Sequence, residues 1–98
     1  MTKAEALAVL KRREADIRQL GINRLSIFGS TARGDETPES DVDLAASLDP
    51  NRAIGLFEFV DIEQQLERML GKKVDLVTEP VRKARLQTEI DRDRVFVF

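Results

Sequence analysis

The 98-residue sequence contains neither cysteine nor histidine. Without cysteine the chain forms no disulfide and has no thiolate nucleophile. Without histidine it lacks the usual zinc sites and the serine or cysteine triads that use an imidazole base. No apolar run approaches the length of a membrane span and the N-terminus has no signal-peptide pattern, so we expect a cytoplasmic protein.

An excess of charge of one sign is also missing. The 16 Lys and Arg residues nearly balance the 18 Asp and Glu residues, which leaves a net charge of −2. A broad nucleic-acid surface normally needs clustered Lys and Arg, so we do not expect direct binding of DNA or RNA. A nucleotide can still bind locally where a metal ion and a few cations offset its charge. The length predicts a single domain, residues 1–98, too small to include a separate substrate-binding domain.

Hydrophobic periodicity predicts alternating helices and strands. Thr2 and Glu5 form a capping box that starts an amphipathic helix of about five turns, which ends before Gly21. Pro80 suits the first position of a later, short helix. The remaining expected elements are strands over 22–28, 40–47 and 72–77, helices over 53–70 and 81–90, and a β-rich piece over 94–98.

The second amphipathic helix has a clear apolar stripe. Its expected buried residues are Leu56, Phe59, Ile62, Leu66 and Met69. The order of the elements predicts an α+β fold, with a mixed sheet of about four strands and helices chiefly on one face. The short connection between the first two strands predicts that they pair antiparallel.

The stretch between residues 27 and 44 contains the candidate site. Gly29 ends the first strand and permits close approach of a ligand to the backbone, and Ser30 can donate its N–H and O–H to phosphate oxygens. Asp41 and Asp43, at i and i+2 on the next strand, would share one face. Neighbouring carboxylates repel each other unless a cation lies between them, which favours Mg²⁺ held together with phosphate oxygens. Taken separately, a capped turn and two solvent-facing acids would be the plainer interpretation.

The Gly-Ser pair, the Arg33-Gly34 pair after it, and Asp-x-Asp about a dozen residues from the Gly-Ser pair resemble the nucleotidyltransferase superfamily that includes DNA polymerase beta. The short chain resembles in particular the minimal nucleotidyltransferases, the antitoxin subunits encoded beside HEPN-domain toxins. The resemblance implies the polymerase beta-like fold, two Mg²⁺ ions at Asp41 and Asp43, and the triphosphate of ATP at Gly29 and Ser30. It also implies that Asp75, the third acid, completes the metal cluster and accepts the proton of the attacking hydroxyl.

The reaction implied by the resemblance is transfer of AMP from ATP to a hydroxyl, expected on a tyrosine of a partner HEPN toxin whose RNase activity is thereby silenced. Two alternatives stay open. One is a non-catalytic antitoxin that blocks its toxin by binding alone. The other is a nucleotidyltransferase that acts on a small molecule such as an aminoglycoside, which the short chain disfavours.

Two of the candidate residues also have plainer interpretations. Arg33 could reach phosphate oxygens, or it could equally pair with Asp35 or Glu36 at the surface. Asp75, seen alone in Val-Asp-Leu-Val, is a strand residue that points to a polar face.

Overall fold

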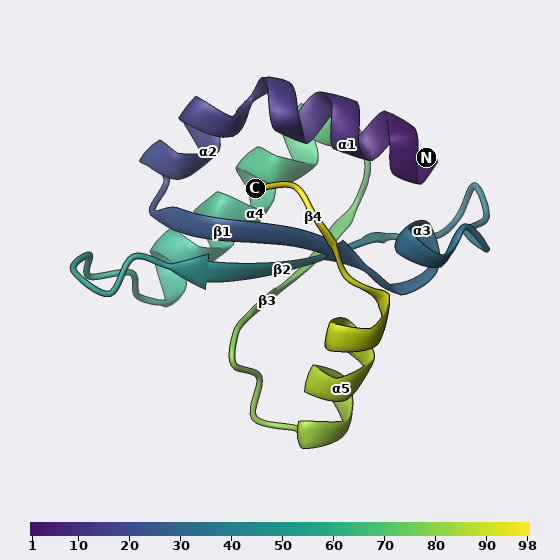
Figure 1. Ribbon diagram of the computed structural model, residues 1–98. Coiled ribbons are helices and arrows are strands. Elements are labelled where there is room, and N and C mark those ends of the chain that lie inside the picture. The colour runs from purple at the N-terminus through teal and green to yellow at the C-terminus, as the bar shows by residue number, and fades with distance from the viewer.

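A four-stranded sheet is the frame of the computed structural model, which describes residues 1–98 (Figure 1). The elements along the chain are α1 (Lys3–Arg12), α2 (Glu14–Gln19), β1 (Ile22–Phe28), α3 (Gly29–Arg33), β2 (Val42–Leu48), α4 (Leu56–Leu70), β3 (Val74–Thr78), α5 (Ala84–Asp93) and β4 (Val95–Phe96).

The strands are arranged in the order β3-β2-β1-β4. Strand β1 pairs antiparallel with both β2 and β4, whereas β2 and β3 are parallel. A parallel pair needs a long crossover, and α4 provides it. The predicted α+β class, the mixed four-stranded sheet and the antiparallel first pair are therefore confirmed.

The two faces of the sheet are covered unequally. Helices α1, α2 and α4 cover one face, and α5 lies against the other (Figure 1). The main core lies under the first three helices, where Leu10, Leu44 and Leu66 are fully buried. A smaller cluster around Ala45 and Ile90 lies on the α5 face. Because side chains alternate along a strand, the residues next to Leu44 face α5, and this alternation places the candidate acids.

The first predicted helix is interrupted at Arg13. The capping box of Thr2 and Glu5 is confirmed, but Arg13 adopts φ −102° and ψ 18° and separates α1 from α2. Its N–H is shared between the carbonyls of Val9 and Leu10, at 3.2 Å from each. Such a shared bond is typical of the tightened last turn of a helix, and it marks the end of α1.

Helix α4 starts three residues later than predicted, after Gly55, which lies in an extended conformation at the N-cap. Ile62 and Leu66 are buried as expected, with Phe59 and Met69 partly buried. The expectation for Leu56 was wrong, because its side chain is 73% exposed. Leu56 lies six positions before Ile62, so at 100° per residue its side chain points well away from the buried stripe.

The predicted start of the last helix was also wrong. Helix α5 begins at Ala84, and Pro80 lies outside it. The Glu79 N–H donates to the Ala46 carbonyl at 2.9 Å, which extends the contact between β3 and β2. The Val81 N–H donates to Oε1 of Gln87 at 3.0 Å. These bonds hold residues 79–83 in a non-helical connection.

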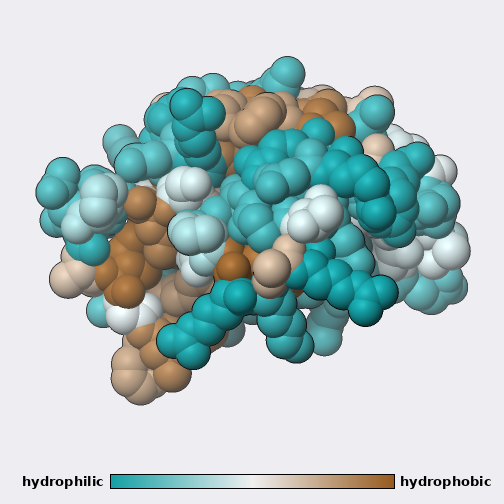
Figure 2. Space-filling model, turned by 60° about the horizontal axis from the view of Figure 1, so that its bottom comes forward, coloured by the Kyte–Doolittle hydropathy of each residue, from teal (hydrophilic) through white to brown (hydrophobic).

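Large hydrophobic side chains are exposed at the start of α4, where Phe57 is 87% exposed beside Leu56 and Val60. Figure 2 shows hydrophobic surface gathered at this end of the molecule, while hydrophilic residues cover most of the rest of the view. No helix combines the length and the low polarity that crossing a membrane requires.

Candidate functional site

Asp43 and Asp75 lie directly opposite each other in the parallel pairing of β2 and β3. Each is flanked by buried apolar residues, such as Val42 and Leu76, that point into the main core. Strand alternation therefore turns both carboxylates to the α5 face. There they line a cavity of about 440 Å³, together with Gly29, Ser30 and Arg33. The fold thus brings five of the six predicted site residues to one cavity.

Asp41 is the predicted site residue that does not line this cavity. It lies just before β2, which begins at Val42 rather than at Ser40, and its side chain is exposed. The first backbone bond of the pairing runs from the Val42 N–H to the Lys73 carbonyl, at 2.9 Å. No three acidic side chains are grouped closely enough to hold a metal ion together. Asp43 and Asp75 form the centre of the site, and Asp41 stands at its edge.

The electrostatics of Asp43 differ from those of an ordinary carboxylate. Its pKa is raised from 3.8 to about 6, first by burial and then by repulsion from Asp75 and Asp41, with Arg33 acting in the opposite direction. This combination of burial and like charge disfavours ionisation. A cation placed between the carboxylates would remove the repulsion.

Gly29 brings the backbone against the Asp43 carboxylate. It has φ +71°, in the left-handed region, and a Cβ at this position would overlap Oδ2 of Asp43. Only glycine can therefore occupy this turn without moving the acid. Ser30 follows in the first turn of α3 and lines the same cavity. The backbone at Gly29 and the Ser30 hydroxyl therefore lie in the same cavity as the carboxylates of Asp43 and Asp75.

Arg33 lies at the end of α3 and forms two ion pairs. Its Nε lies 3.2 Å from Oδ2 of Asp35, and its Nη1 lies 3.0 Å from Oδ2 of Asp93. Hydrogen bonds to these two carboxylates raise the pKa of Arg33, so it stays charged. The surface pairing with Asp35 that the sequence suggested is present, but Arg33 also lines the cavity, so the two interpretations are compatible.

The sequence interpretation missed the wall that α5 contributes. Leu86, Glu89 and Asp93 line the cavity from this helix. Their spacing of three and four residues places them on one helical face, and this was the available signal. That signal does not say which surface of the sheet the helix approaches.

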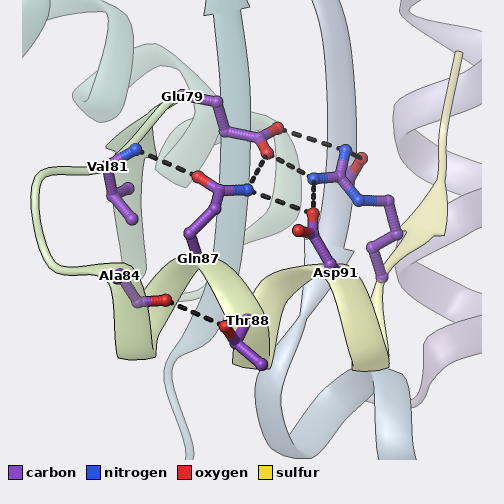
Figure 3. Close-up of polar contacts among 8 residues, drawn as sticks. Glu79, Val81, Ala84, Gln87, Thr88 and Asp91 are labelled. Carbon is purple, nitrogen blue, oxygen red and sulfur yellow. Dashed lines mark hydrogen bonds and ion pairs between the residues drawn. The ribbon is translucent and has the colours of Figure 1, made fainter.

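Hydrogen bonds and ion pairs connect α5 and Arg94, the residue after it, to Glu79 at the end of β3 (Figure 3). Arg94 pairs with Glu79, and both side chains are largely buried, at 17% and 11% exposure. Nη2 of Arg94 also lies 2.9 Å from Oδ1 of Asp91. Nε2 of Gln87 donates to Oε1 of Glu79 at 2.8 Å. These bonds hold the helix that closes one side of the cavity.

The donor set suits a hard divalent cation. Mg²⁺ commonly takes one or two protein carboxylates and completes its shell with phosphate oxygens and water. Asp43 and Asp75 can provide the carboxylates, and Asp41 is close enough to affect the pKa of Asp43. The residues present therefore fit Mg²⁺ where phosphate oxygens and water supply its remaining ligands.

Residues 9–96 match the family described as nucleotidyltransferase domain. The chain is 31% identical over 98 residues to protein adenylyltransferase MntA of Thermococcus cleftensis, covering 99% of this chain and 97% of that protein. It is 30% identical over 98 residues to a Methanocaldococcus jannaschii protein provisionally named a protein adenylyltransferase, covering 98% of each.

Solved structures show the same fold. A protein described as a minimal nucleotidyltransferase superposes with a TM-score of 0.71 at 29% identity, covering 97% of this chain and 95% of that one. A chain of a toxin–antitoxin crystal structure with AMP-PNP has a TM-score of 0.71 at 18% identity, covering 100% and 73%. A chain from the complex of a tri-AMPylated Shewanella oneidensis HEPN toxin with MNT antitoxin has a TM-score of 0.68 at 16% identity, covering 94% and 71%.

Proposed function

Because the chain belongs to the nucleotidyltransferase domain family, in its minimal form, we propose that it is the antitoxin of a HEPN toxin and transfers AMP from ATP to a tyrosine hydroxyl of that toxin. The relatives named protein adenylyltransferase support the reaction. The similar chains from toxin–antitoxin structures, one with AMP-PNP and one with an AMPylated HEPN toxin, support the nucleotide and the partner.

One observation carries the proposal. Asp43 faces Asp75 across two parallel strands, in the cavity that Gly29 and Ser30 also line. Paired carboxylates beside a glycine turn provide separate places for a metal ion and for phosphate oxygens. The chemistry needs both, because a triphosphate alone would be repelled by the acids.

The proposed reaction is an in-line displacement at the α-phosphorus of ATP. The acceptor hydroxyl oxygen forms a bond to this phosphorus, the bond to the bridging oxygen of the β-phosphate breaks, and pyrophosphate leaves. Asp75 accepts the hydroxyl proton, since a carboxylate within reach of the acceptor can act as general base. Ser30 and the Gly29 backbone hold the triphosphate tail, and Arg33 balances the charge of its oxygens.

Asp43 and Asp75 are the residues that would hold Mg²⁺, and Asp41, at the edge of the site, would join them only when the ion and the triphosphate are bound. Bound there, Mg²⁺ would neutralise the triphosphate and stabilise the charge that develops on the entering and leaving oxygens. Asp43, with its pKa near 6, is largely ionised at neutral pH and available as a ligand.

Intact mass spectrometry tests the proposal. The chain is incubated with ATP, Mg²⁺ and a HEPN-domain protein encoded by a neighbouring gene in the same genome. We expect the partner to gain mass in whole AMP units and to lose RNase activity in proportion. Replacing ATP with α,β-methylene-ATP, whose carbon bridge cannot be cleaved, should prevent the gain.

A double variant, Asp43→Asn with Asp75→Asn, separates catalysis from blocking by contact. It should bind the partner, leave its mass unchanged and fail to silence it. Silencing by the double variant without added mass would instead identify a binding-only antitoxin.

A further inference from the structure

Arg33 and Asp93 join two segments that are 60 residues apart in the sequence. Arg33 ends α3, the short helix that begins with Gly29 and Ser30, and Asp93 ends α5. Their side chains meet at 3.0 Å, and both residues line the cavity that contains Asp43 and Asp75. The ion pair therefore belongs to the cavity wall as well as to the contact between the two helices.

The charges that line the cavity are unequal. Four of the lining residues are acidic, namely Asp43, Asp75, Glu89 and Asp93, and Arg33 is the one basic residue among them. A nucleoside triphosphate brings several more negative charges. Arg33 is therefore the one cationic group in this wall that can attract phosphate oxygens, in addition to the hydrogen-bond donors of Gly29 and Ser30.

The two carboxylates that bind Arg33 have different surroundings. The Asp93 side chain is only 7% exposed, whereas that of Asp35 is 62% exposed and lies outside the cavity lining. Asp93 is itself held by Arg92, whose Nε lies 2.9 Å from its other oxygen. The Asp93 side chain is largely inaccessible and is bonded to two arginines, so it is restrained more than the exposed side chain of Asp35.

We propose that Asp93 is a positioning residue: it holds the Arg33 guanidinium at the cavity wall, in the orientation that receives the phosphate oxygens of the nucleotide. The inference rests on the proposed function, because it assigns a role in binding the same nucleotide. Pre-ordering a long side chain removes part of the entropy loss that binding would otherwise incur. Asp93 touches neither the acceptor nor the reacting phosphorus and acts through Arg33.

The test compares Asp93→Asn with Asp35→Asn, since each variant removes one carboxylate charge from Arg33. ATP affinity is measured by calorimetry with Mg²⁺, and AMP transfer to the partner is measured as a function of ATP concentration. We expect Asp93→Asn to raise the Kd and KM for ATP roughly fivefold or more, with a smaller effect on kcat. Asp35→Asn should change both constants less than twofold, by the weakness of exposed pairs.

A double-mutant cycle distinguishes positioning from a general loss of structure. In the Arg33→Gln background, Asp93→Asn should change the Kd for ATP no further, because its effect passes through Arg33. Asp93→Glu, which keeps the charge, should recover most of the affinity. Thermal unfolding of each variant shows whether it folds. If Asp93→Asn fails to fold, the Kd for ATP of Asp93→Glu compared with that of wild type decides whether the charge at residue 93 positions Arg33.

Equal ATP constants for Asp93→Asn and Asp35→Asn would overturn the inference, as would full additivity of Arg33→Gln and Asp93→Asn. Either result leaves the proposed function standing if the wild-type chain still transfers AMP. A wild-type chain that neither binds ATP nor transfers AMP would overturn both.

Discussion

Gly29 and the Asp43 carboxylate are in direct contact, with no space for a side chain between them. A Cβ on residue 29 would overlap Oδ2 of Asp43 and come within 3.0 Å of the carboxylate carbon. The residue also has φ +71°, which disfavours any L side chain. The turn before α3 and the acid on β2 therefore fix each other's position.

Gly29→Ala should for this reason lose activity well beyond its loss of stability. Gly71→Ala is the matched control, because Gly71 has φ +66° at the end of α4 with open space around its Cβ position. Backbone strain should lower the free energy of unfolding of each variant by about 1 kcal/mol, and Gly29→Ala should lose somewhat more because the Asp43 carboxylate must move away from the new Cβ. Only Gly29→Ala should reduce the AMP-transfer rate by about 100-fold, the effect of a misplaced catalytic group. Equal rates for the two variants would contradict the assignment.

The raised pKa of Asp43 predicts a pH-dependent stability of the metal-free protein. Between the ordinary value of 3.8 and about 6, the folded chain binds more protons at this carboxyl than the unfolded chain does. Stability from this group is therefore present at low pH and is lost as pH rises through that window. Asp43→Asn removes this pH-dependent loss of stability. In EDTA at pH 7 the variant should therefore have a higher free energy of unfolding than wild type. We expect a difference on the order of 1 kcal/mol, because solvent partly screens the site.

Calorimetric unfolding at two pH values checks this prediction. The difference between Asp43→Asn and wild type should shrink markedly at pH 4, because Asp43 is then largely protonated in the folded wild type. A variant that is less stable than wild type at pH 7, or a difference that is the same at both pH values, would refute it.

Asp75→Asn should act mainly on kcat. The asparagine keeps the shape of the side chain but cannot accept a proton, so the rate at saturating ATP should fall by a factor of about 100 or more.

The same variant should change the pKa of Asp43. Residue 75 lies opposite Asp43, and the substitution should leave the fold intact while it removes a neighbouring negative charge, which lowers the pKa of Asp43. Carboxyl titration by NMR measures that pKa, and an unchanged value would mean that the two acids do not interact.

Arg94→Met tests the polar anchor of α5. The change leaves Glu79 largely buried without its cation, so we expect a loss of about 2 kcal/mol in the free energy of unfolding, measured with urea. Arg13→Met is the control, because Arg13 pairs with Asp16 at an exposed position, with 45% and 56% of the side chains accessible. It should cost less than about 0.5 kcal/mol. Similar losses in both variants would indicate that the network in Figure 3 contributes little.

Much of the fold could be predicted because the strand patterns are local. Asp43 and Asp75 each lie between buried apolar neighbours, and this alternation identifies the face that they occupy without any structure. It does not identify their register, which depends on the pairing of β2 with β3 after the crossover through α4. The prediction that these two acids lie close together therefore depended on the order of the strands along the chain.

The α5 wall could not be predicted in the same way. Glu89 and Asp93 lie on one face of an amphipathic helix, but the location of that face depends on contacts between distant residues. Arg33 and Asp93 are 60 residues apart, and Arg94 and Glu79 are 15 apart. Leu56 is a second example. Its apolar character predicted burial, but the position of the first turn of α4 outside the core depends on tertiary packing.

The most direct test of nucleotidyl transfer uses ATP labelled at one phosphorus at a time. The chain and its HEPN partner are incubated with Mg²⁺ and either α-labelled or γ-labelled ATP, and the label on each protein is counted after separation. Transfer of AMP predicts label on the partner from the α position only, with its loss in Asp43→Asn. Label from the γ position, or none from either while the partner is still silenced, would contradict the account.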